Sequence, residues 1–380
     1  MSTKINGPIN IVRIEGEING IMKILYIYFD FHMDVTQQTK CEDFLSDDVT
    51  KYIKKELLET SDKDIDFFME HRMDTPGNNL IKYSKYKDKY IEEMEKFFYQ
   101  NFRKEKADFK NVRFHYADIR NSSILFSNRT IDNILLDYSC MNYRIQNATT
   151  MINIYSDNIK YINDIINILT GKEIKIDKKI KDDPIKKVID ISKKYNNKNV
   201  KEKIKELIDL FIKDANELIK LLSNGINLII EHENICKSYY DENGFRKRTK
   251  DKETEIESYY YDDDDKIASI KKNHNLIFQK HMEIHSSIMD MYFLRRFCDK
   301  TYITHGIFYG GGAHCMRYIN YLVKAFDFKI THASYSSEKI SKLNNILSVK
   351  IYDDHELNKY LYPPLLIQCS DISDFPKHFN

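Results

Sequence analysis

Residues 302–318 read YITHGIFYGGGAHCMRY, and the fold is interpreted outward from this stretch. The β-branched and aromatic run Tyr302–Tyr309 predicts a strand. Three consecutive glycines, Gly310 to Gly312, predict a turn in which the backbone adopts positive φ and approaches a ligand closely. An apolar pattern at helical spacing follows, from about His314 to Phe326. The stretch is therefore predicted to place His314 at the end of a strand.

A phosphate-binding loop is one alternative for the glycine turn. The lysine and hydroxyl of G-x-x-x-x-G-K-[ST] are missing, as is the acidic residue of a dinucleotide fingerprint about twenty residues later. The imidazole of His314 suits a metal ligand or a general base, since its ordinary pKa of roughly 6.5 allows either role. A histidine that caps the helix and packs on the glycines remains open as the structural alternative.

Three earlier apolar runs, at residues 21–31, 64–69 and 111–116, predict buried strands that end at ionisable side chains. An amphipathic pattern at 49–59 predicts a helix between the first two. This alternation predicts an α/β fold with a central, mostly parallel sheet flanked by helices. The polar residues at the three strand ends are Asp30, His32 and Asp34, then Glu70, then Asp118 and Arg120.

Open α/β sheets bind ligands at the carboxyl ends of their strands, so the candidate site is predicted there. His32, Glu70 and His314 are candidate ligands of a divalent metal, or the groups that activate water. Arg120, and Arg296 from a later helix, are candidates for stabilising negative charge on a substrate. The structural alternatives are a polar strand exit at His32 and buried ion pairs of Asp118 with Arg120 and of Asp290 with Arg296.

The middle of the chain differs from both ends in composition and in the spacing of its apolar residues. Residues 151–285 predict a lysine-rich helical insertion between two halves of the α/β core, 1–150 and 286–380. Its last helix, predicted at 267–297, carries His274, His281 and His285, which lack the glutamate of H-E-x-x-H and are interpreted as core or surface residues. The remaining predictions are a helix at 86–102, a strand at 328–332, a helix at 337–346, a strand at 347–352 and an irregular tail from Pro363.

Composition limits the classes of partner. Lys and Arg number 59 against 58 Asp and Glu, so no global field favours nucleic acid or an anionic membrane. No segment reaches the roughly 20 apolar residues of a membrane span, and Met1–Gly20 lacks the apolar centre of a signal peptide. An intracellular protein is expected. Free thiols are expected for six singly scattered cysteines: Cys41, Cys140, Cys236, Cys298, Cys315 and Cys369.

The order of these motifs resembles that of the erythromycin esterase, TraB and Tiki superfamily. The second GxxH motif is intact as Gly311-Gly312-Ala313-His314, whereas the first, Phe29-Asp30-Phe31-His32, keeps the histidine and lacks the glycine. Glu70 and Arg120 would fill the glutamate and arginine positions. The resemblance covers about residues 20–125 and 285–352. It looks closest to uncharacterised members from large DNA viruses, whose I-M-D-x-Y-x-x-x-R helix and Y-x-G-x-x-H strand exit match Ile288–Arg296 and Tyr309–His314.

The resemblance implies a hydrolase that acts on an ester or peptide bond of a small-molecule or peptide substrate, with a divalent metal or a histidine in the reaction. For a viral member, the host cytoplasm or the virion would be the location. The alternative is a catalytically inactive interaction or virion-associated protein that keeps the scaffold and docks through its lysine-rich insertion.

Overall fold

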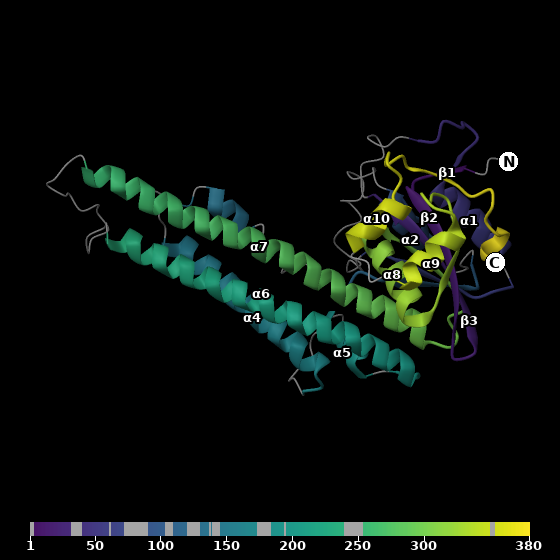
Figure 1. Cartoon of the computed structure of the whole chain (residues 1–380), viewed down its shortest axis with the longest axis horizontal. Coiled ribbons are helices and arrows are strands. Elements are labelled where there is room, and N and C mark those ends of the chain that lie inside the picture. The colour runs from purple at the N-terminus through teal and green to yellow at the C-terminus, as the bar shows by residue number, and fades with distance from the viewer. Residues whose placement is uncertain are drawn as a thin grey trace. The chain divides into compact units, whose positions relative to one another are not determined.

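The computed structural model describes residues 4–31, 40–60, 62–71, 90–102, 109–119, 130–136, 138, 145–172, 184–193, 195–238, 254–349 and 354–380. The chain forms two compact units. The first combines Met1–Ile119, Tyr195–Lys203 and Tyr292–Asn380, and the second combines Arg120–Lys194 and Ile204–Met291. Both ends of the sequence therefore contribute to the first unit, which carries the strands (Figure 1).

The first unit contains a six-stranded sheet with the order β6-β5-β7-β3-β2-β8. Strands β6, β5, β7 and β3 are parallel, whereas β2 is antiparallel to both β3 and β8. The predicted α/β fold with a mostly parallel sheet is confirmed. The strands are β2 (Asn10–Ile18), β3 (Ile21–Asp30), β5 (Ile65–Met69), β6 (Val112–Tyr116), β7 (His305–Gly311) and β8 (Lys329–Ala333).

Strand β2 was not predicted. It forms a hairpin with β3 through Asn19 and Gly20, whose φ angles of 53° and 76° suit the two-residue turn that matches the twist of the strands. Strand β7 comes late in the chain and lies between β3 and β5. Its apolar composition suits this central position, where Ile307, Phe308 and Tyr309 are all fully buried.

Helices α1 (Val49–Glu59) and α2 (Tyr90–Phe102) pack on one face of the sheet. Alternate strand residues such as Tyr28, Phe67 and Tyr309 face the same way and share one hydrophobic cluster with both helices. The apolar residues of α1 recur at three- and four-residue spacing, as its predicted amphipathic pattern requires. The predicted helices at 49–59 and 86–102 are confirmed where the structure describes them, that is at Val49–Glu59 and from Tyr90 onward.

The opposite face is covered by α8 (Gly312–Phe326) and by the end of α7 (Thr254–Asp299). Phe293 of α7 packs edge-on against Phe68 of β5 with ring centroids 5.0 Å apart, and it stacks on Tyr318 of α8 at 4.3 Å. Tyr318 in turn packs edge-on against Phe308 of β7. These interleaved aromatic rings fix where α8 begins relative to the sheet.

The C-terminal part corrects two predictions. The strand predicted at 347–352 is wrong where it is described, because residues 347–349 belong to α9 (Ile340–Val349). The tail is not irregular throughout, since β9 (Cys369–Asp371) pairs with β1 (Lys4–Asn6). Strand β1 also pairs with β4 (Asp47–Asp48). The other C-terminal elements are helix α10 (Asp354–Leu361) and the 3-10 turn η2 (Lys377–Phe379).

The expectation of free thiols is wrong for Cys41, Cys236 and Cys369. Cys41 and Cys369 form a disulfide across a sequence separation of 328, and Cys236 is disulfide-bonded too. Cys298 and Cys315 are free and buried. Cys41 can pair with Cys369 because β1 lies between β4, from the N-terminal part of the chain, and β9, from the C-terminal part. The local spacing of the cysteines does not reveal this arrangement.

The second unit is helical and contains α4 (Ile145–Leu169), α5 (Pro184–Lys193) and most of α6 (Lys198–Ser238) and α7. Helices α6 and α7 run antiparallel, because Lys266 bonds Glu231 whereas Lys280 bonds Asp214 (Figure 1). His274 and His281 of α7 are buried in this unit, and His274 hydrogen-bonds Tyr155 of α4 at 2.9 Å. The helical character predicted for this region is confirmed.

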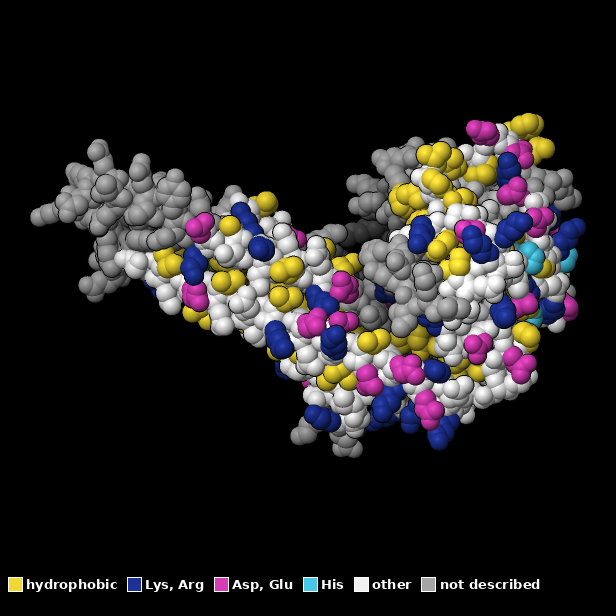
Figure 2. Space-filling model, in the orientation of Figure 1, with side chains coloured by type: hydrophobic (Ala, Val, Ile, Leu, Met, Phe, Trp, Pro, Cys, Tyr) yellow, Lys and Arg dark blue, Asp and Glu magenta, His cyan; other side chains and the backbone are white. Residues whose placement is uncertain are grey.

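Among the described helices, none is both long and apolar enough to cross a membrane. Figure 2 shows Lys and Arg side chains interspersed with Asp and Glu on the visible face, as the near-zero net charge of +1 predicts. The described residues of that face therefore form no large surface of a single sign.

Candidate functional site at the carboxyl edge of the sheet

Four strand ends meet at one edge of the sheet because β3, β7, β5 and β6 are parallel neighbours. Asp30 at the end of β3 is opposite Gly311 of β7, and Met69 of β5 is opposite Tyr309. Met69 is also opposite Tyr116 of β6. Glu70 therefore leaves β5 beside the glycines of β7, at the edge where parallel sheets bind ligands.

Glu70 and His314 lie side by side at this edge. The Nε2 atom of His314 is 3.4 Å from Oε1 of Glu70, and each side chain is only 5% exposed. The second carboxylate oxygen, Oε2, accepts a hydrogen bond of 2.6 Å from the backbone N–H of Gly311, the residue before helix α8. Glu70 thus occupies the positive end of the helix dipole, a favourable place for a carboxylate.

The glycines act through close approach rather than through unusual torsion angles. Gly310 and Gly311 complete β7 and Gly312 begins α8, and none of the three has positive φ, so the predicted turn is wrong. A Cβ atom on Gly310 would lie 2.8 Å from Cβ of Glu70. The absence of a side chain there is what lets β5 and its glutamate lie so close to β7.

A second pair of polar side chains lies at the same edge, on the face that carries α1 and α2. The hydroxyl of Tyr309 donates a 3.1 Å hydrogen bond to Oδ1 of buried Asp30. Burial, reinforced by the charge of Asp30, raises the pKa of Tyr309 well above its ordinary value. Tyr309 therefore acts as a hydrogen-bond donor that fixes Asp30. Beyond Glu70, His71 Nδ1 contacts Oε1 of Glu95 at 3.1 Å.

Cys315 is next to His314 in the sequence and is buried. Its thiol donates to the backbone carbonyl oxygens of Gly310 at 3.3 Å and Tyr28 at 3.5 Å. A thiol held by the backbone in the interior is unsuited to nucleophilic attack.

Of the other predicted site residues, only Arg296 lies in the part of the chain that the structure describes. His32 and Arg120 lie outside the described residues, so their convergence with Glu70 and His314 stays a prediction. Arg296 is half-buried on α7, and its positive charge contributes to the lowered pKa of His115, mainly a result of burial. Its buried Nε atom has no hydrogen-bond partner among the described parts of the chain. Arg296 therefore lies within electrostatic range of His115 of β6.

The spacing of Glu70 and His314 fits a shared cation. Zinc binds carboxylate oxygen and imidazole nitrogen at about 2.0–2.2 Å, so two tetrahedral ligand atoms are separated by roughly 3.3–3.6 Å. The observed Nε2–Oε1 distance of 3.4 Å falls in this range and is long for a charged hydrogen bond. Glu70 and His314 could hold such a metal, with further ligands from outside the described residues or from water.

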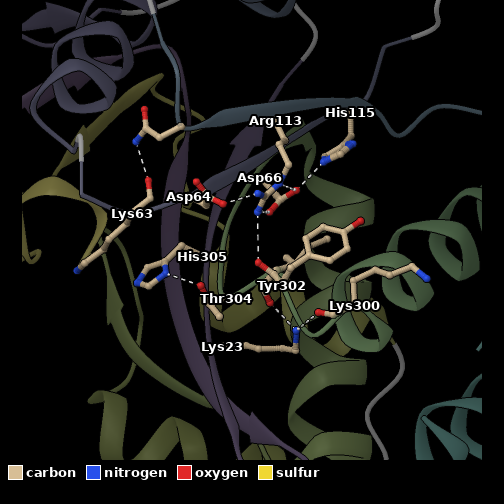
Figure 3. A network of polar contacts seen from close by, with 12 residues as sticks. Lys23, Lys63, Asp64, Asp66, Arg113, His115, Lys300, Tyr302, Thr304 and His305 are labelled. Carbon is tan, nitrogen blue, oxygen red and sulfur yellow. Dashed lines mark hydrogen bonds and ion pairs between the residues drawn. The ribbon is translucent and has the colours of Figure 1, made fainter. Parts of the chain in front are cut away.

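A polar network that was not predicted from the sequence lies at the opposite edge of the sheet (Figure 3). Asp66 of β5 is fully buried and accepts two hydrogen bonds from Arg113 of β6, of 3.0 and 2.6 Å. Its Oδ1 also lies 2.7 Å from Nε2 of His115. Arg113 donates in addition to exposed Asp64 and packs over the ring of Tyr302. A charged residue inside an apolar strand pattern, Asp66 in IDFFM, was the available signal.

Opposing effects set the ionisation of this network. Burial alone would raise the pKa of Asp66, but hydrogen bonds and charge from His115 and Arg113 outweigh it, and the pKa is lowered. The pKa of His115 is lowered too, because burial outweighs the attraction of Asp66. At neutral pH the neutral His115 ring therefore donates to an ionised Asp66, so the network is a buried, paired structural element.

Lys23 of β3 lies near this network, and its side chain reaches the turn that follows α7 (Figure 3). Its Nζ atom donates to the carbonyl oxygens of Lys300 at 2.8 Å and Ile303 at 2.5 Å. Burial lowers the pKa of Lys23 to about 8. Its hydrogen bonds stabilise the turn that leads from α7 into β7 and so fix the strand that carries the glycines.

Comparison with known proteins gives a family without a described activity. A model described as a family of unknown function (DUF5847) matches residues 3–380. Uncharacterized protein R706 of Acanthamoeba polyphaga mimivirus is 32% identical over 416 residues, which cover 100% of this chain and 97% of that protein. Uncharacterized protein R161 of the same virus is 30% identical, with 99% and 98% covered. No solved structure matches the chain.

Proposed function

This chain belongs to the family of unknown function DUF5847, and we propose that it is a hydrolase whose reaction takes place at the carboxyl edge of the parallel strands. The contact between Glu70 and His314 carries the proposal. A carboxylate and an imidazole from distant parts of the chain lie together at the edge where such sheets bind ligands. The backbone of Gly311 holds one oxygen of Glu70, which leaves the other directed at His314.

Two related chemistries use this pair. Glu70 and His314, with His32, would hold a divalent metal, which when bound supplies Lewis-acid activation of water and of the substrate carbonyl. Without a metal, the neutral imidazole of His314 would take a proton from water while Glu70 orients the ring and stabilises its charged form. In either case Arg120 and Arg296 are proposed to stabilise negative charge that develops on the substrate.

The class of substrate is proposed from the order of the motifs. The sequence Glu70, Arg120 and then Gly311-Gly312-Ala313-His314 follows the erythromycin esterase, TraB and Tiki pattern, whose members act on esters or peptides. The relatives from a large DNA virus agree with the viral branch of that resemblance. We propose a small ester or a peptide as the substrate.

The test compares Glu70→Gln and His314→Ala with the wild-type chain on panels of ester and peptide substrates, with and without a chelator. Glutamine can still accept the N–H of Gly311, so Glu70→Gln should keep the fold. Both variants should lose at least about 100-fold in turnover, the usual contribution of a general base or metal ligand. Ala313→Ser is the matched control, because Ala313 is the exposed neighbour of His314 and its change should leave turnover unaltered.

Turnover that persists in both Glu70→Gln and His314→Ala would exclude this pair from catalysis. Loss of turnover on chelation, with recovery on adding Zn²⁺ or Mn²⁺, would favour the metal-bound chemistry over the metal-free one.

An interaction protein is the second candidate, and exposed apolar side chains near the Cys41–Cys369 disulfide favour it. Phe44 and Leu45 follow the first cysteine and are 92% and 61% exposed, and Leu365, shortly before the second, is 70% exposed. Isolated apolar residues on a surface need no explanation, but several near one cross-link suit a docking surface. A chain that shows no turnover but binds other virion proteins through these residues would support this candidate.

The disulfide also bears on the proposed location. Such bonds persist in oxidising environments, including virion surfaces, and are rare in reducing cytosol. Of the two viral locations, the host cytoplasm and the virion, the Cys41–Cys369 bond favours the virion. Mass spectrometry of purified particles under non-reducing conditions would detect the cross-linked peptides there.

A further inference from the structure

A cluster of potential ligand atoms lies in the first unit, on elements that carry none of the predicted site residues. Glu56 and Glu59 are three residues apart on helix α1 and therefore neighbours on its surface. His378 lies in the turn η2 near the C-terminal end. One ligand atom from each of the three residues lies within 4.8 Å of the others.

The distances in this cluster resemble those between ligands of one cation. Nδ1 of His378 is 3.5 Å from Oε2 of Glu56 and 3.4 Å from Oε2 of Glu59. Ligand atoms around a tetrahedral zinc ion, bound at about 2.0–2.2 Å, are roughly 3.3–3.6 Å apart. Nδ1 is buried and has no hydrogen-bond partner within the described ranges. A buried acceptor without a donor, facing two carboxylates, is what a cation would satisfy.

The cluster is held in place by packing and by the backbone. Oε2 of Glu56 accepts a 2.8 Å hydrogen bond from the N–H of His378 itself. Phe379, the next residue, is buried and packs edge-on against Tyr26 of β3 with ring centroids 5.3 Å apart. The hydrogen bond to Glu56 and the packing of Phe379 together hold His378 against α1 before any cation binds.

The open side of the cluster leaves room for solvent. The side chain of Glu56 is 11% exposed, whereas those of Glu59 and His378 are 44% and 40% exposed. Zinc sites with three protein ligands commonly take water as the fourth. Two carboxylates and one neutral imidazole also give a net charge of −2, which suits a divalent cation.

We propose that Glu56, Glu59 and His378 form a binding site for a divalent cation of the zinc class, completed by water, which links helix α1 to the C-terminal segment. The ligands would be Oε atoms of the two glutamates and Nδ1 of His378, with Nε2–H left facing outward. The competing arrangement is a protonated His378 paired with the two glutamates. That arrangement needs no metal and would compete with one for the same nitrogen.

The experiment measures Zn²⁺ binding to the full chain by isothermal titration calorimetry after removal of metals with a chelator. It uses the double variant Glu70→Gln/His314→Ala as background, so that a cation bound at the strand edge does not contribute to the measured number of Zn²⁺ ions per chain. One Zn²⁺ per chain should bind, and the affinity should fall at least about tenfold in Glu59→Gln and in His378→Ala. Co²⁺ in place of Zn²⁺ should give the visible absorption of a tetrahedral site.

Glu59 is well exposed, so Glu59→Gln should fold even if His378→Ala does not, and it alone can decide the outcome. His332→Asn is the control for adventitious binding, because His332 is a partly exposed histidine of the same unit outside the cluster. No Zn²⁺ binding in the background variant, or equal binding in Glu59→Gln and its parent, would overturn the assignment. Either result leaves the test of Glu70 and His314 untouched, since that test measures turnover.

Discussion

Nε2 of His314 lies 3.4 Å from Oε1 of Glu70, although the two residues come from opposite ends of the chain. The contact exists because β7 is inserted between β3 and β5, which places the start of α8 against the end of β5. The long helical part of the sequence therefore separates two strands that are neighbours in the sheet. Their contact is the feature from which the proposed hydrolase site is built.

The space at Gly310 should be too small for a side chain, so a substitution there should destabilise the fold. In Gly310→Ala the new Cβ would lie 2.7 Å from ring carbons of Phe308 and 2.8 Å from Cβ of Glu70, neither of which has free space in the packed core. Overpacking of this kind costs about 1–3 kcal/mol in the free energy of unfolding. Urea unfolding followed by tyrosine fluorescence measures it. Ala313→Ser, on the exposed side of α8, should change stability by less than about 0.5 kcal/mol.

The buried network should respond unequally to the loss of its two aspartates. Asp66→Ala removes the partner of Arg113 and of His115 in the interior, and breaking a buried pair costs about 3–5 kcal/mol. Asp64→Ala removes an exposed partner of the same Arg113, which is worth about 1 kcal/mol or less. Equal losses of stability in the two variants, measured by urea unfolding, would contradict the burial argument.

The second unit should weaken in mild acid. Burial lowers the pKa of His281 to about 4, from 6.5, so the unfolded chain binds a proton that the folded one excludes between these values. Stability is complete above pH 6.5 and is lost as the pH falls, by about 2 kcal/mol at pH 5 from this group alone. His281→Phe should reduce this loss. Hydrogen exchange in peptides of α7 at pH 7 and pH 5 measures it, with His332→Asn of the first unit as the control.

The disulfide should stabilise the first unit. Cys41→Ser removes the bond to Cys369, and loss of a native disulfide typically costs about 2–5 kcal/mol. Reduction should act in the same direction in the wild-type chain, although it also cleaves the bond of Cys236. Cys298→Ala is a matched control, because it removes a free thiol and keeps the disulfides, so reduction should lower its stability as much as it lowers that of the wild-type chain. Thermal unfolding with and without reductant separates the two effects.

The sequence predicted the strands of the parallel sheet because each is a short apolar run with a polar exit, as in Ile65–Met69 followed by Glu70. It also predicted the helical region, whose apolar residues recur at helical spacing. Strand β2 was missed because its ionisable residues, Arg13, Glu15 and Glu17, interrupt the apolar pattern, although Arg13 is buried and bonded to Thr331. Local pattern does not encode partners in space.

The same distinction applies to the sites. Glu70 and His314 could be chosen from their positions at strand ends, and the structure brings these two together. The cluster of Glu56, Glu59 and His378 had no signal in the sequence, because the histidine reaches α1 through tertiary contacts, namely the packing of Phe379 on Tyr26 and the hydrogen bond from its own N–H to Glu56. The pairing of Asp66 with Arg113 and His115 likewise depends on the register between β5 and β6.

The bond between Cys41 and Cys369 also determines how the molecule would carry a mechanical load. It closes a covalent ring across a sequence separation of 328, and the whole helical unit lies inside that ring. Tension applied to the segments outside the ring would pass across the sulfur–sulfur bond and by-pass every helix from α4 to α7. Those helices could then be cut, stretched or exchanged for another insert while the two ends of the chain stayed tethered.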